Sequence, residues 1–312
     1  MRVVFFGTPR FAVPSLRALF DAGFEIPLAV TQPDRPVGRS GQPRPSPVAE
    51  LAEALRLPVE KPDRLRGNAA FLERLAETRP DAIAVVAYGK LLPSEILELP
   101  PLGCVNVHAS LLPRHRGASP VQAAILAGDA ETGVVTMRIV PELDAGPIYL
   151  ESRTKIGERD TTETLGGRLA RSGAELLIAT LRGLEEGTLV PRPQIGEATF
   201  TRLIRREDAR VDWDEPASAI DRRLRAFTPW PGLYATLGGE RIKLLELEPA
   251  GKILSAREPG MIWEEWGKTM VVAGQGTALF LKTVQRSGRR PVTGSEFLRG
   301  LSFRPVRFEP AS

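Results

Sequence analysis

Short apolar runs alternate with amphipathic stretches through residues 1–182, and no other feature of the chain constrains its fold as much. The apolar runs predict strands at 3–6, 27–31, 57–60, 81–88, 103–108, 133–140 and 147–156. The amphipathic stretches predict helices at 11–22, 48–56, 67–77, 119–127 and 161–182. Strands and helices that alternate in units of about 30 residues are typical of a mostly parallel sheet with helices on both faces. Residues 1–189 are therefore predicted to form an α/β domain.

The pattern changes after residue 184. Residues 190–205 contain prolines and lack a helical period, so we interpret them as a linker between two domains. Residues 216–227 suggest one basic helix, and short strand-like runs such as LYATL, RIKLLELE and TALFLKTV follow it. Short strands separated by turn residues are typical of a small β-barrel. Residues 206–312 are therefore predicted to form a second domain.

A loop rich in Pro, Gly and Arg is expected at residues 31–48, TQPDRPVGRSGQPRPSPV. Loops longer than about 12–15 residues in a compact domain are usually functional or disordered. Arginine binds phosphate through paired hydrogen bonds and stacks on bases. Arg35, Arg39 and Arg44 are therefore candidate contacts to a nucleic acid, and a solvated loop is the alternative.

Charge and cysteine content narrow the functional class. Residues 1–189 carry 22 Lys and Arg against 23 Asp and Glu, whereas residues 190–312 carry 20 against 15. The basic excess at the C-terminal end favours a polyanionic partner, although a surface kept basic for solubility is the alternative. No run approaches the ~18 consecutive apolar residues of a membrane-spanning helix. The single cysteine, Cys104, excludes an internal disulfide and fits a reducing cytoplasm.

Two scarce residue types occur together in the strand predicted at 103–108, GCVNVH. The chain has two asparagines, Asn68 and Asn106, and two histidines, His108 and His115. Side chains alternate along a strand, so Asn106 and His108 share a face at its carboxyl end, where open α/β sheets bind ligands. A histidine can take a proton near neutral pH and an asparagine amide can donate to an oxyanion, which suits acyl transfer. The alternative is a pair of hydrogen-bonded polar residues at a strand end.

Asp144 is the candidate carboxylate partner of His108. It lies in VPELDAGPIY, residues 140–149, a turn that follows a predicted strand and is expected at the same carboxyl edge of the sheet. A carboxylate there could raise the basicity of His108 or relay a proton. An aspartate that only shapes a turn is the alternative.

Other chemistries have less support in the sequence. Cys104, Asn106 and His108 make a poor ligand set for zinc, so no metal is expected. The chain lacks GxGxxG, GxxxxGK[ST] and GxSxG. Dinucleotide binding, nucleoside triphosphate hydrolysis and serine hydrolase chemistry are therefore disfavoured.

Several segments together resemble the methionyl-tRNA formyltransferase family of folate-dependent formyltransferases. They are FGTPRFAVPSL, TQPDRPVGR, VVAYGKLLP, NVHASLLPRHRGASPVQ, LDAGPIY and, in the second domain, RAFTPWPG. The string NVHxSLLPxxRG with a later LDxG is specific to folate-dependent formyltransferases, and PDRPVGR with AFTPWPG narrows the resemblance to the tRNA enzymes. The resemblance covers nearly the whole chain.

The resemblance implies a Rossmann-like N-terminal domain that binds 10-formyltetrahydrofolate and a C-terminal barrel, similar to an OB-fold, that helps to hold tRNA. The catalytic trio of the family falls on Asn106, His108 and Asp144. Its folate contacts fall on residues at two strand ends, Val86, Tyr88, Ser110, Leu111, Leu112 and Pro113. Its tRNA-reading arginine falls on Arg39. Further arginines could contact tRNA, namely Arg35 and Arg44 in the same loop and Arg202, Arg205, Arg222 and Arg223 later in the chain.

This chain departs from the family pattern in two places. Family members often carry paired lysines after the loop arginine, where this chain reads Ser40-Gly41-Gln42-Pro43-Arg44. They frequently carry tryptophan between the two arginines of SLLPRxRG, where this chain has His115. We expect the loop to grip the acceptor stem differently, whereas the trio is intact.

The expected activity is transfer of the formyl group from 10-formyltetrahydrofolate to the α-amino group of methionine on initiator methionyl-tRNA. We expect direct attack through a tetrahedral intermediate, by a cytoplasmic monomer, at the start of translation. A formyltransferase for a sugar-nucleotide amine would keep the same trio and stays an alternative, while a glycinamide-ribonucleotide enzyme would lack the second domain. A tRNA-binding module without catalysis is the alternative from another class, and the intact trio argues against it.

Overall fold

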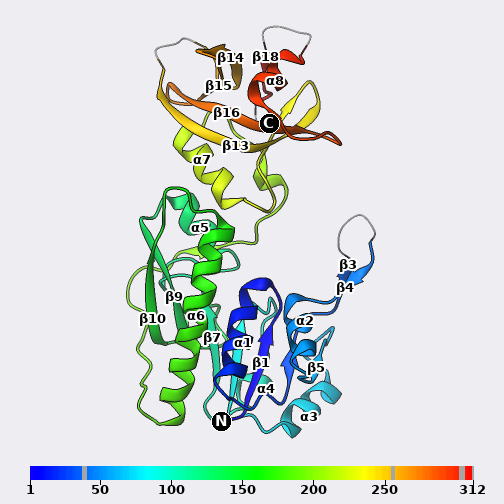
Figure 1. Cartoon of the computed structure of the whole chain (residues 1–312). Coiled ribbons are helices and arrows are strands. Elements are labelled where there is room, and N and C mark those ends of the chain that lie inside the picture. Colours follow the sequence, from blue (N-terminus) through cyan, green and yellow to red (C-terminus); the bar gives the residue numbers. More distant parts are fainter. Residues whose placement is uncertain (37–40, 254–256, 302–305, 311–312) are drawn as a thin grey trace. The chain divides into compact units, whose positions relative to one another are not determined.

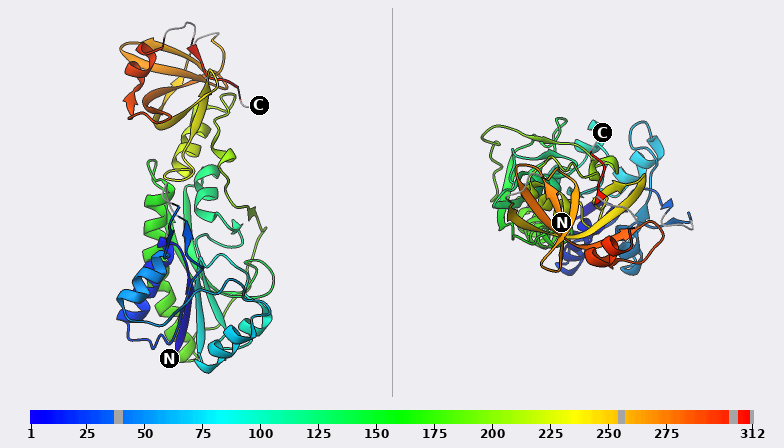
Figure 2. Two further views of the ribbon diagram at one scale, coloured as in Figure 1. Left: turned by 90° about the vertical axis from the view of Figure 1, so that its right-hand side faces the viewer. Right: turned by 90° about the horizontal axis from the view of Figure 1, so that it is seen from above.

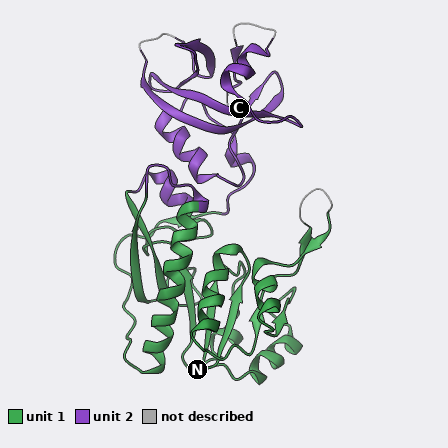
Figure 3. Ribbon diagram, in the orientation of Figure 1, with its two compact units in different colours: residues 1–121, 130–156, 164–202 green, residues 122–129, 157–163, 203–312 purple. Residues whose placement is uncertain are grey.

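The computed structural model describes residues 1–36, 41–253, 257–301 and 306–310. The chain divides into two compact units, which are coloured separately in Figure 3. Unit 1 comprises residues 1–121, 130–156 and 164–202, and unit 2 comprises residues 122–129, 157–163 and 203–312. The segment expected as a linker thus contributes most of its residues to unit 1.

A seven-stranded sheet forms the centre of unit 1 (Figure 1). Five strands lie parallel to their neighbours, and in spatial order they are β5 (Val59–Glu60), β2 (Ala29–Val30), β1 (Val3–Gly7), β6 (Ala82–Val86) and β7 (Cys104–His108). Two antiparallel strands, β9 (Glu131–Arg138) and β10 (Ile148–Lys155), complete the sheet beyond β7, with β10 at the edge. The predicted strand 147–156 is therefore an edge strand.

Helices pack on both faces of this sheet because its central strands are apolar on both sides. All five residues of β1, VVFFG, are buried, as a strand covered on both faces requires. One core cluster unites Val3 and Phe5 with α1 (Val13–Asp21), α2 (Pro47–Ala54) and α6 (Thr162–Glu185). The other unites Val4 and Phe6 with α3 (Ala69–Glu77) and α4 (Ser94–Leu97).

The strand order reverses direction between β1 and β6. From β1 the chain moves outward through β2 to β5, and it then crosses to β6 and β7 on the other side. In open α/β sheets, ligands bind outside the carboxyl ends of the strands at such a reversal. The carboxyl ends of β1 and β6 flank this reversal, and β7 lies directly beside β6, so a site is expected along this edge.

Three short features lie outside the main sheet of unit 1. The loop expected at 31–48 contains a two-stranded pair, β3 (Arg35–Pro36) with β4 (Pro43–Arg44), and it ends where Ser46 caps α2. The parallel pair β8 (Arg116–Gly117) and β11 (Phe200–Thr201) joins the segment after β7 to the expected linker. A 3-10 helix, Arg10–Ala12, precedes α1.

Unit 2 is built around a strongly curved antiparallel sheet, whose strands are seen from two further directions in Figure 2. Its strands in spatial order are β12 (Tyr234–Leu237), β13 (Glu240–Lys252), β16 (Thr277–Arg286), β15 (Lys268–Ala273), β14 (Met261–Glu265) and β18 (Val306–Arg307), and β17 (Val292–Thr293) pairs with β16. The remaining elements are α5 (Pro120–Ala127), which begins in unit 1, a 3-10 helix (Glu207–Ala209), α7 (Ala217–Ala226) and α8 (Gly294–Arg299). The long strand β13 pairs with both β12 and β16, and its pairing with β16 contains register shifts, which bend a strand and increase the curvature of a sheet.

The predicted fold class, a Rossmann-like α/β domain with an OB-fold-like barrel, is confirmed. The barrel interior is apolar, and Trp213 stacks on Phe308 with ring centroids 5.1 Å apart. In the described part of the chain, no helix has the length and apolar character that crossing a membrane requires.

Candidate active site

Strand β7 presents Asn106 and His108 at the carboxyl edge of the parallel strands. The two residues are two positions apart, so their side chains leave the same face of the strand. His108 is buried, with 6% of its surface exposed, whereas Asn106 is half-buried. Within the described residues the Asn106 amide has no hydrogen-bond partner, so its donors are available to a ligand.

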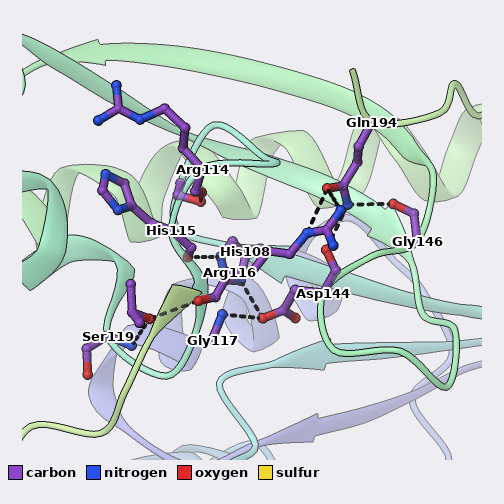
Figure 4. A network of polar contacts seen from close by, with 11 residues as sticks. His108, Arg114, His115, Arg116, Gly117, Ser119, Asp144, Gly146 and Gln194 are labelled. Carbon is purple, nitrogen blue, oxygen red and sulfur yellow. Dashed lines mark hydrogen bonds and ion pairs between the residues drawn. The ribbon is translucent and has the colours of Figure 1, made fainter. Parts of the chain in front are cut away.

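The two ring nitrogens of His108 face different groups (Figure 4). Nε2 lies 3.1 Å from the carbonyl oxygen of His115, and Nδ1 lies 3.7 Å from Asp144 Oδ2. A carbonyl oxygen only accepts, so the proton of the neutral ring resides on Nε2 and leaves a lone pair on Nδ1. The distance of 3.7 Å between Nδ1 and Oδ2 is too long for a direct hydrogen bond. Nδ1 can therefore take a proton from another molecule next to the carboxylate.

The pKa of His108 lies below its ordinary value. Burial is the largest cause because it disfavours the charged ring. The carboxylate of Asp144 raises the pKa, as does the bond to the His115 carbonyl, while the charges of His115 and Arg116 lower it. The net effect keeps the imidazole neutral at physiological pH and ready to accept a proton.

Asp144 reaches His108 by a route that the sequence did not predict. We expected its turn at the carboxyl edge because it follows a strand, but β9 runs antiparallel to β7 and its last residue, Arg138, pairs with Val105. Strand β9 therefore ends near the start of β7, and residues 139–147 fold back to bring Asp144 to His108. The sequence analysis assigned no direction to this strand, because an apolar run does not reveal whether a strand is parallel or antiparallel.

The backbone around Gly117 orients the Asp144 carboxylate. The N–H of Gly117 donates to Asp144 Oδ2 at 2.8 Å. Gly117 has φ +107°, and a Cβ at this position would collide with the backbone oxygen of Thr201. Glycine is thus required by the left-handed backbone and by the close approach of β11.

Residues of the expected linker complete this network, and the sequence analysis missed them. Gln194 Nε2 donates to the carbonyl oxygens of Asp144 at 2.7 Å and Gly146 at 2.8 Å. Gln194 Oε1 accepts from Nη2 of Arg116 at 2.6 Å and from its Nε at 3.1 Å (Figure 4). Thr199 Oγ1 accepts from the backbone N–H of His115 at 2.8 Å. A segment without helical or strand period gave no signal for these contacts.

Comparison with known proteins identifies the family. The model of the Formyl transferase family matches residues 1–181, and that of the Formyl transferase C-terminal domain matches residues 203–302. A methionyl-tRNA formyltransferase of Thermus thermophilus is 46% identical over 98% of this chain and 98% of the relative. That of Synechococcus elongatus is 44% identical over 96% of this chain and 97% of the relative.

The chain belongs to the methionyl-tRNA formyltransferase family. It is therefore an enzyme that transfers formyl groups. Its fold is also similar to the solved N-formyltransferase of Helicobacter canadensis in complex with folinic acid and dTDP-3-aminofucose, with a TM-score of 0.66. That similarity covers 91% of this chain and 98% of the other at 16% identity, so it concerns the fold alone.

In this member of the formyltransferase family, the residues predicted to bind folate gather around the ends of β6 and β7. The side chains of Val86 and Tyr88 are buried in the core clusters on opposite faces of the sheet. Burial raises the pKa of Tyr88 to about 12, and its hydroxyl has no partner among the described residues.

The second group of predicted folate contacts forms a tight turn after β7. Ser110 Oγ donates to the carbonyl oxygen of Arg114 at 2.6 Å, and Arg114 N donates to that of Leu111 at 3.1 Å. Leu112 is buried with Val135, Met137 and Ile148, and Pro113 accepts a backbone bond from Thr199 at 3.3 Å. This turn is thus stabilised by its own hydrogen bonds, by the packing of Leu112 and by the bond from Thr199.

The arginines predicted to contact tRNA have different surroundings in the formyltransferase chain. Arg35 and Arg44 are exposed and pair across β3 and β4, while Arg39 lies outside the described residues. Arg202, the last residue of unit 1, and Arg205 of unit 2 are both exposed. Arg222 Nε donates to the Leu126 carbonyl at 3.2 Å, and Arg223 forms an ion pair of 3.0 Å with Glu215. Arg223 also donates to the carbonyls of Asp208 and Arg210, so its donors are occupied within unit 2.

Two further features lie apart from the trio of this formyltransferase. Among the described residues, no group of three His, Cys, Asp or Glu side chains could hold a metal ion. A cavity of about 610 Å³ lies in unit 2, lined in part by Arg286, Arg289 and Arg290. This cavity includes none of the predicted site residues.

Proposed function

We propose that this enzyme transfers the formyl group of 10-formyltetrahydrofolate to the α-amino group of methionine on initiator methionyl-tRNA, as a step of translation initiation. Full-length identity of 44–46% to methionyl-tRNA formyltransferases supports the tRNA substrate. The family of the catalytic part supports the folate co-substrate. We assign residues 1–189 to catalysis, residues 190–205 to the connection and residues 206–312 to tRNA binding.

The reaction is a direct transfer between two amines. The lone pair of the methionine nitrogen attacks the formyl carbon and a tetrahedral oxyanion forms. The bond from that carbon to N10 of the folate then breaks and returns the oxygen to a carbonyl. The methionine nitrogen loses one proton and N10 gains one, so atoms and charge balance.

The trio offers one group for each requirement of this reaction. The Asn106 amide, which has no partner among the described residues, is suited to donate to the oxyanion, a role worth about 3 kcal/mol in other enzymes. The Nδ1 lone pair of His108 is suited to accept the proton of the attacking amine, because Nε2–H is occupied by the His115 carbonyl. Asp144 would stabilise the imidazolium that results and pass its proton toward N10 through water.

The observation that supports this proposal is the Asp144 carboxylate beside the buried ring of His108, with Asn106 two positions earlier on the same face of β7. Radiolabelled formyl transfer to methionyl-tRNA tests it. Asn106→Ala, His108→Ala and Asp144→Ala should each lower turnover by about 100-fold or more. Asn68→Ala is the matched control, because it removes the cap of α3 and should affect stability alone. Near-normal turnover in a trio variant would remove that residue from the mechanism.

A sugar-nucleotide amine is the second candidate acceptor, because a formyltransferase that acts on such an amine would keep the same trio. The same assay with an amino-sugar nucleotide in place of tRNA separates the two. Transfer to the sugar with none to methionyl-tRNA would overturn the proposed substrate. Folate binding without transfer to either acceptor would favour a protein that only binds tRNA and folate.

A further inference from the structure

The segment from Arg192 to Thr201 is hydrogen-bonded to two separate parts of the site. Arg192 exchanges two backbone bonds of 2.8 Å with Ile148, just after the Asp144 turn. Thr199 and Thr201 bind the segment after β7, through the N–H of Arg116 and the pairing of β11 with β8. Between these two attachments lies Gln194, whose amide contacts both parts.

The hydrogen-bonding capacity of the Gln194 amide is fully used. A primary amide has two N–H donors and an oxygen with two acceptor sites. The donors reach the carbonyls of Asp144 and Gly146, and the oxygen receives two N–H groups from Arg116. Rotating the amide by half a turn would set its N–H groups against the guanidinium, so these contacts permit one orientation.

The turn that Gln194 holds has a backbone that needs external support. Asp144 has φ +47°, a left-handed conformation that is unfavourable for a residue with a side chain. Its carboxylate is held by one backbone N–H, that of Gly117. The two bonds from Gln194 therefore act where the strain lies, on the carbonyl of Asp144 and on that of Gly146.

We propose that Gln194 is a positioning residue for formyl transfer, which holds the Asp144 turn at His108 and fixes Arg116 on the other side of the same amide. The expected effect of Gln194 on kcat rests on the proposed function, whereas its expected effect on the pKa of His108 does not. The groups that face His108 are Asp144, His115 and Arg116, and the effect of Asp144 exceeds that of Arg116. A loosened turn should therefore lower the pKa of His108 further.

Titration of the histidine ring signals by NMR tests the structural consequence without any substrate. The chain has two histidines, so a His115→Gln spectrum assigns both signals. Gln194→Met keeps the length of the side chain and removes its hydrogen bonds, and the midpoint of His108 should move to lower pH. Ile195→Ala, at a neighbouring position that is 89% exposed, should leave the midpoint unchanged. An unchanged midpoint in a folded Gln194→Met protein would overturn the proposal.

Steady-state kinetics test the functional consequence. Gln194→Met should lower kcat by about 10- to 100-fold, as misplaced catalytic groups do, with both KM values nearly unchanged. Gln194→Glu keeps the oxygen acceptor for Arg116 but loses both N–H donors to the turn, so its kcat should fall by a similar factor. It replaces Gln194→Met in this test if the Met variant fails to fold. A fall in melting temperature with normal kcat in either variant would mean a structural role only. If the unmodified enzyme does not formylate methionyl-tRNA, the proposed function fails while the NMR result still decides the role of Gln194.

Discussion

At the scale of single residues, Gly117 satisfies three requirements at once. It takes a left-handed backbone, it leaves room for the Thr201 oxygen, and its N–H orients the Asp144 carboxylate. A side chain at this position would force β11 away or rotate the peptide that Asp144 binds. Stability and the catalysis proposed for Asp144 therefore depend on the same atom positions.

Gly117→Ala should destabilise the enzyme by about 1–3 kcal/mol through backbone strain and should also lower kcat. Gly187→Ala is the control, since Gly187 has φ +67° and an added Cβ there would meet nothing within 4 Å. Urea unfolding and formyl transfer, measured together, separate the effects: the control should lose stability alone. Full activity in Gly117→Ala would contradict the role assigned to its N–H.

The pH dependence of kcat/KM should report the charge state of His108. Because we propose that the neutral ring accepts the proton, activity should fall on the acid side as His108 becomes charged, with a midpoint below the ordinary histidine pKa. Asp144 raises the pKa of His108, so Asp144→Asn should move the acid limb to still lower pH in addition to slowing turnover. A limb that stays in place would mean that His108 does not control it.

Sequence reasoning reached some residues of the site and missed others for physical reasons. Asn106 and His108 are two positions apart on a strand, so a period of two places them on one face. Gln194 acts through backbone carbonyls of a distant turn, and a contact of this kind leaves no period or motif in the chain.

At the scale of elements, α6 approaches β7 closely because of Gly173. A Cβ there would lie 2.7 Å from Val107 Cγ1 and 3.2 Å from Val134 Cγ2. Val107 stands between Asn106 and His108 on the strand, so this contact supports the strand from behind. Most strands were predictable because they are apolar runs in the sequence. The antiparallel direction of β9 was not predictable, because it depends on how the chain connects β7 to β9 in the folded sheet.

Gly173→Ala should cost about 1–3 kcal/mol by overpacking this contact. Gly166→Ala and Gly167→Ala lie in the same helix with no atom within 4 Å of the new Cβ, so they should stabilise the enzyme by about 0.5–1 kcal/mol. Thermal unfolding of the three variants checks the contrast. Equal effects at all three positions would show that helix propensity alone governs them.

The loop at residues 31–48, which the sequence analysis assigned to tRNA, contains the pair β3 and β4 with the exposed Arg35 and Arg44. Arg39→Ala should raise KM for methionyl-tRNA and leave KM for the folate unchanged, because an arginine–phosphate or stacking contact is lost. Arg17→Ala, which removes an exposed arginine of α1, is the control. Equal KM values for tRNA in the two variants would argue against a role for the loop.

At the scale of the whole molecule, the basic excess lies in residues 190–312. Contacts between arginines and phosphates release counterions, so the affinity for tRNA should fall about 10-fold or more between roughly 50 and 200 mM salt. Filter binding at several salt concentrations measures this slope, with the folate KM as the control that should change little. A flat response for tRNA would argue that the second domain is not an electrostatic tRNA-binding surface.

The attachment of residues 192–201 to the site has a consequence for recombination between formyltransferases. A hybrid enzyme joined at residue 189 would inherit Gln194, Thr199 and Thr201 from the wrong parent, and a junction after Arg202 would keep them with the trio they support. Such a hybrid would also have to match at three hydrogen bonds that join residues from before and after the junction. Arg222 donates to the Leu126 carbonyl, Arg225 donates to the Asp160 carbonyl, and Thr162 donates to the Ala226 carbonyl. Exchange of whole C-terminal modules is therefore expected to succeed only between parents that agree at these few positions.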